Sequence, residues 1–458
     1  MTSLVSNKTY NTPALSSEEI GIPESLSTQI QPKLTEIYNQ YVNVPSTSGN
    51  SFSDGGQFSF QLPTVGYLES GSLNLRFNVQ FNYTGSGVNW SFAGSSASCG
   101  QLFNRISAQC GSIIIDDIQN YFSYHSLLLE SCSMPNYAEN TANINEGCYS
   151  DATPSTNGGA GSGIAYSSTT IYPTPYFSFS GTSSYSFNMN VCLPFLNSGR
   201  SFPLFLLQAP MILTFYLNTS SNAFVTTGAV SNTSFTLSNP SINYHQLCLP
   251  RQLELSIKDT MRATGRLYEM NLGGVNNYIN AVPANSSVNY NLSTQLASLN
   301  AVAYVAIQNL GVQTASKYFF KPETQDTTVN SRLYCNSNQV LNFACNSDDI
   351  RLGEWRRALS GVFNFNTVHR YAYNNTAFGR PSWNSAVAEG STPQTRGYIN
   401  GFNLRRLSED NVSFGGTETH SLILNLDRNT STACTYFIYL FYDKVITISA
   451  DGMVSVNC

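Results

Sequence analysis

Residues 73–81 read L-N-L-R-F-N-V-Q-F, a strict alternation of apolar and polar side chains. Because successive side chains of a strand point to opposite faces of the sheet, this period of two predicts a strand with one buried face. The same rhythm recurs at residues 58–62 and 185–195. An almost continuous apolar variant fills residues 436–448. The sequence therefore predicts an all-β protein.

The apolar run at 436–448 follows L-I-L-N-L at 422–426. Runs without alternation are typical of central strands that are buried on both faces, and here they predict a sandwich of two packed sheets. Asp451 and Gly452 then predict a tight turn into a last strand that begins near Met453.

The length and composition favour two large β-domains. A chain of 458 residues exceeds one ordinary core, and the length prior predicts two or three domains. Charged residues make up only 11%, against about 25% in a typical globular protein. A surface of Asn, Ser, Thr, Gln and Tyr suits a protein that contacts other copies of itself, because interface cores are depleted in charge and enriched in aromatic residues.

The net charge of -5 and the pI near 5.4 give no field that would attract a polyanion, so no direct nucleic-acid binding is expected. The first fifty residues have a net charge of 2 - 4 = -2, from Lys8 and Lys33 against Glu18, Glu19, Glu24 and Glu36. This balance argues against the coat of a small RNA virus, which commonly carries a basic arm.

The ten cysteines show no C-x-x-C pair and no Cys/His cluster with zinc spacing, which favours free thiols in a reducing compartment. The N-terminus has no signal-peptide pattern, and no apolar run reaches the roughly 18 residues of a membrane span. We therefore expect a soluble product without a secretory leader.

Residues 1–50 carry four prolines and no alternation, so we expect an extended arm. Within it the sequence predicts a short amphipathic helix between Pro32 and Pro45. Its apolar face consists of Leu34, Ile37, Tyr38 and Tyr41. Two interpretations remain open: the arm docks on a neighbouring subunit or an underlying layer, or the helix packs on its own domain.

A first β-domain is expected over residues 51–249 and a second over 250–458. One organisational pattern occurs in both. A strand from Arg105 leads to Asp-Asp-Ile at 116–118 and a helix from Tyr121, and a strand from Arg332 leads to Asp-Asp-Ile at 348–350 and another helix. The aspartates would cap these helices, with a paired-carboxylate site as the alternative. The long segment 136–180 is expected to be a projecting surface loop.

No usual catalytic motif is present, the four histidines are isolated in sequence, and neither an enzyme, a cofactor nor a metal site is expected. Two basic pairs, Arg356-Arg357 and Arg405-Arg406, lie near Glu354 and Glu409. We interpret them as intersubunit salt bridges or solvated faces rather than as phosphate contacts.

Several ordered segments carry a resemblance to a known family. They are G-G-Q-F-S-F-Q-L-P at 55–63, the strand to residue 118 with its Tyr-rich helix, F-P-L-F-L-L at 202–207, M-I-L-T-F-Y-L at 211–217, L-S-N-P-S-I-N-Y at 237–244 and the closing hairpin at 435–456. The chain resembles the double jelly-roll major capsid proteins of tailless double-stranded DNA viruses, the adenovirus and tectivirus lineage that includes virophages and polinton-like viruses. It lacks the G-G-L-x-Q-L start of the large algal and iridovirus-type members, which favours the virophage or polinton-like side.

The resemblance implies two tandem eight-stranded jelly rolls with short helices in the connections. It also implies a homotrimer that forms a pseudo-hexameric capsomer and tiles an icosahedral shell. Neighbouring capsomers, penton and minor capsid proteins are the implied partners, and an internal membrane beneath the shell is left open. The implied location is the virion, after synthesis and assembly in the host cytoplasm or nucleus.

The rival hypothesis is a carbohydrate-binding β-sandwich protein or a glycosidase. Trp90, Trp383 and Tyr398 are its candidate sugar-stacking residues. A glycosidase would also need two carboxylates roughly 5 to 9.5 Å apart.

Overall fold

The computed structural model describes most of the chain from Tyr38 onward. The described residues are 38–86, 88–93, 98–132, 179–196, 199–226, 230–292, 294–307, 330–345, 350, 353–354, 357–358, 399–405, 415–427 and 433–458. The predicted loop at 136–180 falls outside them except for its last two residues, which form a strand.

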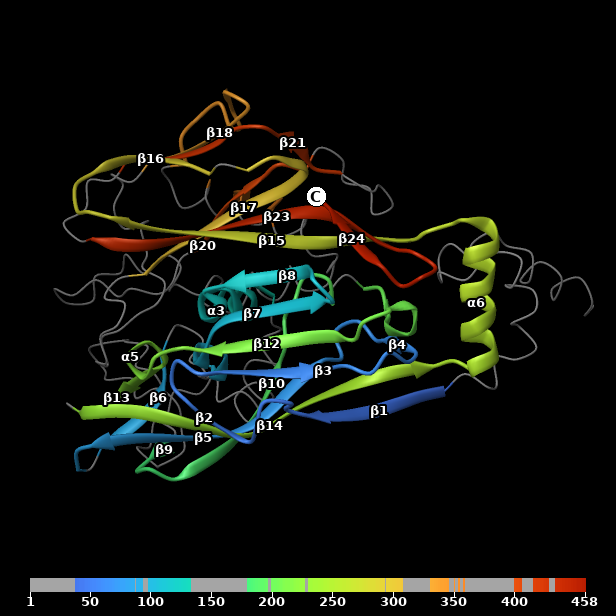
Figure 1. Ribbon diagram of the computed structural model, residues 1–458. Helices are drawn as coiled ribbons and strands as arrows, with labels where there is room; N and C mark the ends of the chain where they lie inside the picture. The colour runs from blue at the N-terminus through green and yellow to red at the C-terminus, as the bar shows by residue number, and fades with distance from the viewer. Residues whose placement is uncertain are drawn as a thin grey trace, which may run out of the picture.

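The strands form five sheets, and Figure 1 shows two of them above the other three. The first outer sheet contains β10 (Ser184–Asn190), β5 (Asn74–Thr84), β14 (Ser231–Cys248), β4 (Tyr67–Leu68), β11 (Phe202–Pro203), β1 (Tyr38–Pro45) and β2 (Ser51–Ser53). The first inner sheet contains β3 (Gln57–Gln61), β12 (Met211–Leu217), β7 (Phe103–Cys110) and β8 (Ile113–Gln119). The end sheet contains β13 (Phe224–Thr226), β6 (Asn89–Phe92) and β9 (Phe179–Ser180).

The later part of the chain forms the other two sheets. The second inner sheet contains β15 (Tyr268–Val282), β23 (Cys434–Ile448), β17 (Leu296–Ile307), β20 (Ile399–Asn403), β21 (Thr417–Thr419) and β24 (Val454–Asn457). The second outer sheet contains β16 (Ser287–Asn291), β22 (Leu422–Asp427), β18 (Asn330–Cys335) and β19 (Asn338–Gln339). Short helices occupy connections: η3 (Cys99–Leu102), α3 (Tyr121–Cys132), η5 (Leu204–Leu206), α5 (Ser220–Ala223) and α6 (Arg251–Thr264).

The alternation at 73–81 becomes β5, as predicted. Its apolar positions Leu75, Phe77 and Val79 are at most 1% exposed, and its Asn, Arg and Gln positions face outward. The opposing layer contributes Phe58 and Phe215, whose rings stack with centroids 5.3 Å apart. A sandwich core filled by alternate residues of two sheets is the result.

The predicted helix between Pro32 and Pro45 is wrong from Tyr38 onward, where the chain forms the strand β1. This strand pairs with β14 residue for residue, from Tyr38 opposite Cys248 to Pro45 opposite Ser241. Val42 and Val44 alternate with exposed polar residues and pack against the core. The edge of β14 offers β1 backbone partners along its whole length, whereas an isolated helix of this length is only marginally stable. Leu34 and Ile37 lie outside the described residues.

The single strand predicted from Arg105 to Ile118 is instead the hairpin β7–β8. Cys110 pairs with Ile113 across a two-residue turn, and Gly111 takes a left-handed conformation with φ of 59°. Such turns favour glycine because it has no Cβ to clash. The helix expected from Tyr121 is confirmed as α3.

The expected aspartate caps on this helix are also wrong, because Asp116 and Asp117 lie inside β8. Asp117 accepts two hydrogen bonds from Arg105 on β7, at 2.6 and 2.9 Å, while Asp116 points to the opposite face. The two carboxylates therefore do not form a paired site. Asn120 precedes α3 instead, and its carbonyl accepts the backbone N–H groups of Ser123 and Tyr124. Asp348 and Asp349 lie outside the described residues.

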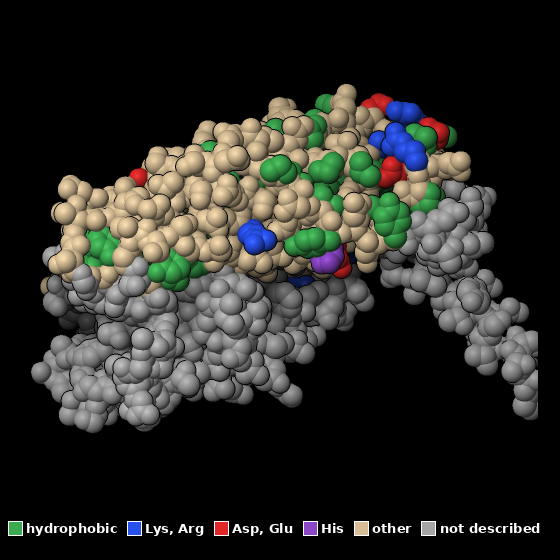
Figure 2. Space-filling view, turned by 90° about the horizontal axis from the view of Figure 1, so that it is seen from below, with side chains coloured by type: hydrophobic (Ala, Val, Ile, Leu, Met, Phe, Trp, Pro, Cys, Tyr) green, Lys and Arg blue, Asp and Glu red, His purple; other side chains and the backbone are tan. Residues whose placement is uncertain are grey.

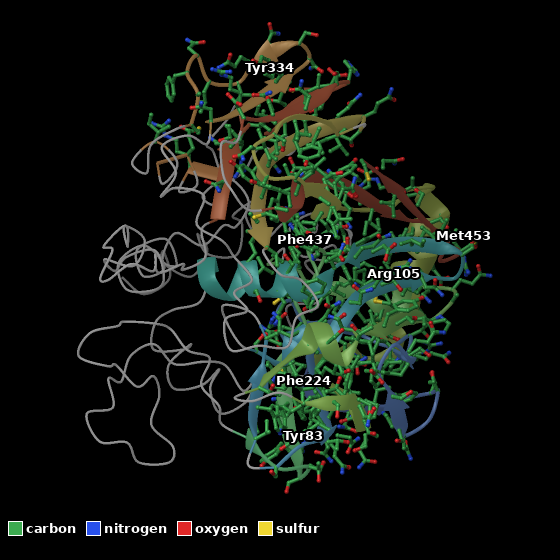
Figure 3. All side chains as sticks on the ribbon, turned by 90° about the vertical axis from the view of Figure 1, so that its left-hand side faces the viewer. Tyr83, Arg105, Phe224, Tyr334, Phe437 and Met453 are labelled. Carbon is green, nitrogen blue, oxygen red and sulfur yellow. The ribbon has the colours of Figure 1, made fainter. Side chains whose placement is uncertain are left out.

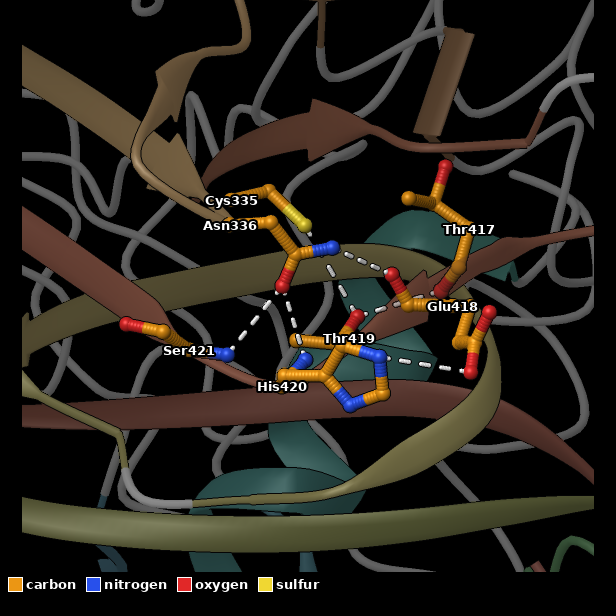
Figure 4. A network of polar contacts seen from close by, with 7 residues as sticks. All are labelled: Cys335, Asn336, Thr417, Glu418, Thr419, His420 and Ser421. Carbon is orange, nitrogen blue, oxygen red and sulfur yellow. Dashed lines mark hydrogen bonds and ion pairs between the residues drawn. The ribbon is translucent and has the colours of Figure 1, made fainter.

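The strand expected from Arg332 onward is likewise a hairpin, formed by β18 and β19. Asn336 and Ser337 have φ of 50° and 67°, the left-handed pair typical of a type I′ turn. Figure 4 shows how Asn336 anchors this turn: its side-chain oxygen accepts the backbone N–H of His420 at 2.8 Å, and its amide donates to the carbonyl of Glu418 at 2.7 Å. A single asparagine thus ties the β18–β19 turn to the loop before β22.

The strand β23 belongs to two cores at once. Tyr436, Ile438 and Leu440 pack against the second outer sheet. The intervening Phe437 and Tyr439 belong to the core that includes both layers of the first sandwich. Figure 3 shows Phe437 at the level of α3, between Phe224 of the first sandwich and Tyr334 of the second. The prediction of a strand buried on both faces is confirmed, and the second face is covered by the other sandwich.

The helix α3 supplies much of that cover. Its Phe122 ring lies 5.6 Å from Phe437, and its Tyr124 ring lies 5.7 Å from Tyr439, centroid to centroid. Aromatic pairs at these separations contribute about 0.5–1.5 kcal/mol beyond their burial. The two sandwiches are therefore joined by a hydrophobic core as well as by the linking helix α6.

A buried ion pair lies in the same junction. Lys444 of β23 bonds to the carboxylate of Asp116 on β8, and both side chains are at most 3% exposed. The Lys444 ammonium also donates to the carbonyl of Ile115 at 2.7 Å, and Asp116 accepts the backbone N–H of Phe195 at 3.1 Å. Burial raises the pKa of the Asp116 carboxyl, and the ammonium opposes that rise.

The side chains of eight of the ten cysteines are described, six of them buried, and no two of these eight are joined by a disulfide. For Cys110, Cys248, Cys335 and Cys458 the expectation of free thiols is confirmed.

Removing one partner of the buried ion pair should destabilise the protein strongly. We expect Lys444→Met to lower the free energy of unfolding by about 3–5 kcal/mol, because Asp116 is left buried without its counter-charge. The double variant Asp116→Asn, Lys444→Met should recover most of that loss. Urea unfolding followed by fluorescence measures both. Arg105→Met, which breaks the half-exposed pair with Asp117, is the control and should cost about 1 kcal/mol or less. A double variant no better than the single one would contradict the expectation.

His125 on α3 should make the fold sensitive to acid. Its side chain is fully buried beside Ser98, whose hydroxyl lies 3.1 Å from Nδ1. Burial lowers the pKa of His125 to about 4, against a partly opposing hydrogen bond with the Asn190 backbone. The folded state favours the neutral imidazole. Its contribution to the free energy of unfolding is therefore complete above pH 6.5 and is lost as the pH falls toward 4.

We expect this histidine to contribute about 3 kcal/mol of that loss, at about 1.4 kcal/mol per pH unit. His125→Gln should flatten the decline of thermal midpoint between pH 6.5 and 4, whatever its effect at neutral pH. Identical pH slopes for the two proteins would refute the assignment.

Candidate assembly surface

The outward face of the first outer sheet is almost free of charge. Across β1, β5, β10 and β14 the only Lys, Arg, Asp or Glu is Arg76. The residues beside it form cross-strand rows of short polar side chains. These rows are Ser186–Asn78–Ser238, Asn188–Arg76–Ser241 and Asn190–Asn74–Asn243. Figure 2 shows this face, on which charged side chains are sparse except at the end that carries α6.

Hydrogen bonds run along these rows. The Ser186 hydroxyl donates to the Asn78 side-chain oxygen at 2.7 Å, and the Asn43 amide donates to the side-chain oxygen of Asn243 in the Asn190–Asn74–Asn243 row. Amides and hydroxyls exchange water for protein partners without the desolvation cost of an ion. The face is therefore suited to being covered by another protein surface.

The second outer sheet repeats this chemistry on the opposite side of the stack. Asn425 of β22 donates to Asn289 of β16 at 2.7 Å, and Arg332 pairs with Asn425 across the next ladder. The exposed Asp427 ends the same strand. The two outer faces thus flank the molecule, each dominated by neutral polar side chains.

The candidate arm residues lie at the margin of the first outer sheet. Tyr38 and Tyr41 are each 60% exposed, and the Tyr41 ring lies 5.3 Å from the His245 ring of β14. No other described strand pairs with the outer edge of β1. The tyrosines are accessible to a partner, and their role in docking stays a prediction.

The candidate arginines are only partly described. Arg357 bonds to Glu354 at 2.6 Å within its own helical turn, and the Arg357 side chain remains 69% exposed. The backbone N–H of Arg405 donates to the Asn403 side chain at 3.2 Å. Arg356 and Arg406 lie outside the described residues. The predicted intersubunit contacts of these four arginines stay a prediction.

Trp90 is not available for sugar stacking. It is fully buried, with its ring 4.5 Å from Phe179, and its indole N–H donates to the Gly181 carbonyl at 3.1 Å. Trp383 and Tyr398 lie outside the described residues. The carbohydrate-binding alternative is not supported.

The described residues contain no group of three or more His, Cys, Asp or Glu that could hold a metal ion. Of their three histidines, His125 is buried, His245 lies against Tyr41, and His420 lies 3.3 Å from Glu418. No helix of the described part is long and apolar enough to cross a membrane.

Sequence reasoning missed two features of the structure, the polar rows of this surface and a buried ion pair. It did not find the polar rows, although the outward positions of β5, β10 and β14 carry their signal as repeated Asn and Ser at alternate sites. It also missed the Lys444–Asp116 pair, whose partners are 328 residues apart in the chain.

Comparison with solved structures places the fold. A capsid chain of PBCV-1 aligns at 13% identity with a TM-score of 0.56, covering 92% of this chain and 97% of that one. A chain of the Sputnik virophage gives 13% identity and a TM-score of 0.56, covering 92% and 88%. The Faustovirus major capsid protein gives 10% identity and a TM-score of 0.54, covering 90% and 91%. The protein therefore has the double jelly-roll fold, and the fold expected from the sequence is confirmed.

No protein-family model matches the sequence. No curated protein matches it either.

Proposed function

We propose that this protein is the major structural subunit of an icosahedral viral shell and has no enzymatic role. The observation that carries the proposal is the pair of neutral polar outer faces on one fused body of two sandwiches. Such a body offers two lateral surfaces at fixed positions, each of which can be covered by another copy. The likeness in fold to capsid proteins supports the same function.

The assembled state that fits this body is a homotrimer. Three copies with two sandwiches each make a pseudo-hexameric capsomer, and capsomers tile the shell with neighbouring capsomers, penton and minor capsid proteins as partners. Residues 51–249 and 250–458 are the two jelly rolls, and residues 1–50 are the arm, whose last residues form β1. Contacts that are individually modest add up over such a lattice. The protein would then reside in the virion.

Size and shape test the proposal directly. We expect the purified full chain to elute as a trimer and to show six-lobed particles with threefold symmetry in negative-stain microscopy. A protein that remains monomeric at every concentration would refute it.

A charge placed on the neutral face should disrupt the trimer. Ser186→Glu adds a carboxylate to the Ser186–Asn78–Ser238 row. If this face is covered by another copy, the buried unpaired charge should raise the trimer dissociation constant at least tenfold, equivalent to about 1.4 kcal/mol. Thr182→Glu, the same change in the exposed turn before β10, is the matched control. Sedimentation velocity over a concentration series measures both. Equal dissociation of the two variants would remove this face from the interface.

A further inference from the structure

The helix α6 closes one end of the molecule, between β14 of the first sandwich and β15 of the second (Figure 1). Its inward face consists of Ile257, Met261 and Glu254, all at most 5% exposed. Glu254 accepts the backbone N–H of Gly66 at 3.1 Å and pairs with Arg251 at 3.2 Å. One face of the helix is therefore fixed to the body, and the other is left outward.

The outward side of α6 combines positive charge with exposed apolar side chains. Lys258 stands among Arg251 and Arg262, and its pKa is lowered by burial first and then by the nearby Arg251. Arg262 lies 3.7 Å from Asp259 and 3.6 Å from Asp451, so part of its charge is compensated.

Leu255 of α6 is 44% exposed, and beyond the helix Leu267 is 52% and Met453 62% exposed. Figure 2 shows charged side chains gathered at this end of the molecule. A surface that crowds cations and exposes leucine fits an acidic segment that also carries apolar residues.

The described part of the N-terminal arm, which starts at Tyr38, lies beside this surface. Tyr38 pairs with Cys248, and α6 starts three residues further on at Arg251. Because β1 runs antiparallel to β14, Tyr38 is the end of β1 that lies nearest to the start of α6.

One segment of the arm matches the chemistry of α6. Residues 16–24 read S-S-E-E-I-G-I-P-E, with three glutamates, two isoleucines and no cation. Glu24 is 14 residues from Tyr38, a span of about 46 Å when extended. The 14 residues of α6 extend about 21 Å. The segment can therefore reach the whole length of the helix in its own chain.

We propose that residues 16–24 dock on the outward face of α6 of the same chain. The three glutamates face the cations around Lys258, and the two isoleucines cover Leu255. The tether to Tyr38 gives the segment an effective concentration that an untethered partner does not have. This contact goes beyond the proposed function, because it lies within one chain and requires neither a trimer nor a shell.

A negatively charged lipid surface is the competing occupant of the same cations. Asp259 and Asp451 lie within the cation cluster and oppose both occupants alike, so the arm is favoured by its covalent tether at Tyr38. An acidic lipid surface attracts each nearby Lys or Arg by about 1 kcal/mol, so the two occupants differ in a measurable way.

Zero-length carbodiimide cross-linking of the full chain, read by mass spectrometry, tests the proposal. Lys258 is the only lysine of α6, and we expect it to form amide cross-links with Glu18, Glu19 or Glu24. The yield should fall at least fivefold in the triple variant Glu18→Gln, Glu19→Gln, Glu24→Gln and also in 0.5 M salt, where exposed charges are screened. Glu36→Gln, an arm change outside the segment, is the matched control and should leave the yield unchanged.

Three results would overturn the proposal. The first is a wild-type protein without these cross-links, or a triple variant that keeps them. The second is cross-links that join heavy and light chains in an isotopically mixed preparation, since the segment would then dock on another copy. The third is flotation of the full chain with phosphatidylserine-containing vesicles as strong as that of a variant lacking residues 1–30. The oligomeric state is measured separately, so a failed shell function and a failed arm contact are distinguishable.

Discussion

The shared burial of β23 is the constraint on which the rest of the structure depends. Each face of this strand belongs to a different hydrophobic core, with Ile438 and Leu440 on one side and Phe437 and Tyr439 on the other. Neither sandwich can separate from the other without exposing a row of aromatic side chains to water. Domains that are joined by small polar interfaces usually move relative to each other. This interface is instead built mainly from buried aromatic side chains. The two outer faces consequently keep one fixed geometry, which a repeating assembly requires.

The ion pair inside this junction adds specificity that apolar contacts do not provide. A run such as 436–442 is apolar at every position, so a shift by one residue would still bury hydrophobic side chains on both faces. Lys444 accepts no such shift, because its ammonium must reach both Asp116 and the Ile115 carbonyl. Buried ion pairs are weak evidence for stability, but they are well attested as devices that fix register. We interpret Lys444 as the residue that sets how β23 lies on β8.

The sequence predicted the strands that depend on a local pattern of apolar residues. It did not predict features that depend on contacts between residues far apart in the chain. Alternation predicted β5 and β10, and the apolar run predicted β23, because the order of apolar and polar residues shows whether one or both faces of a strand are buried. The segment around Tyr38 and Tyr41 has apolar residues at helical spacing, yet Val42 and Val44 also alternate, and only the open edge of β14 resolves that ambiguity. The roles of Asp116 and Asp117 depend on Lys444 and Arg105, and no local rule distinguishes them from helix caps.

The same limit explains the candidate assembly surface. Serine and asparagine at alternate positions predict only a solvated face, because each position is considered alone. The structure aligns β10, β5 and β14 so that these positions form continuous rows, and a row of amides and hydroxyls has a property that single residues lack. Each row can replace its hydrogen bonds to water by hydrogen bonds to a complementary surface, and no ion has to be removed from solvent. On the face seen in Figure 2, charge is concentrated at the α6 end and the rest is nearly free of it, so association over this face meets little electrostatic opposition. Low charge is therefore better understood as a property of particular faces than of the composition as a whole.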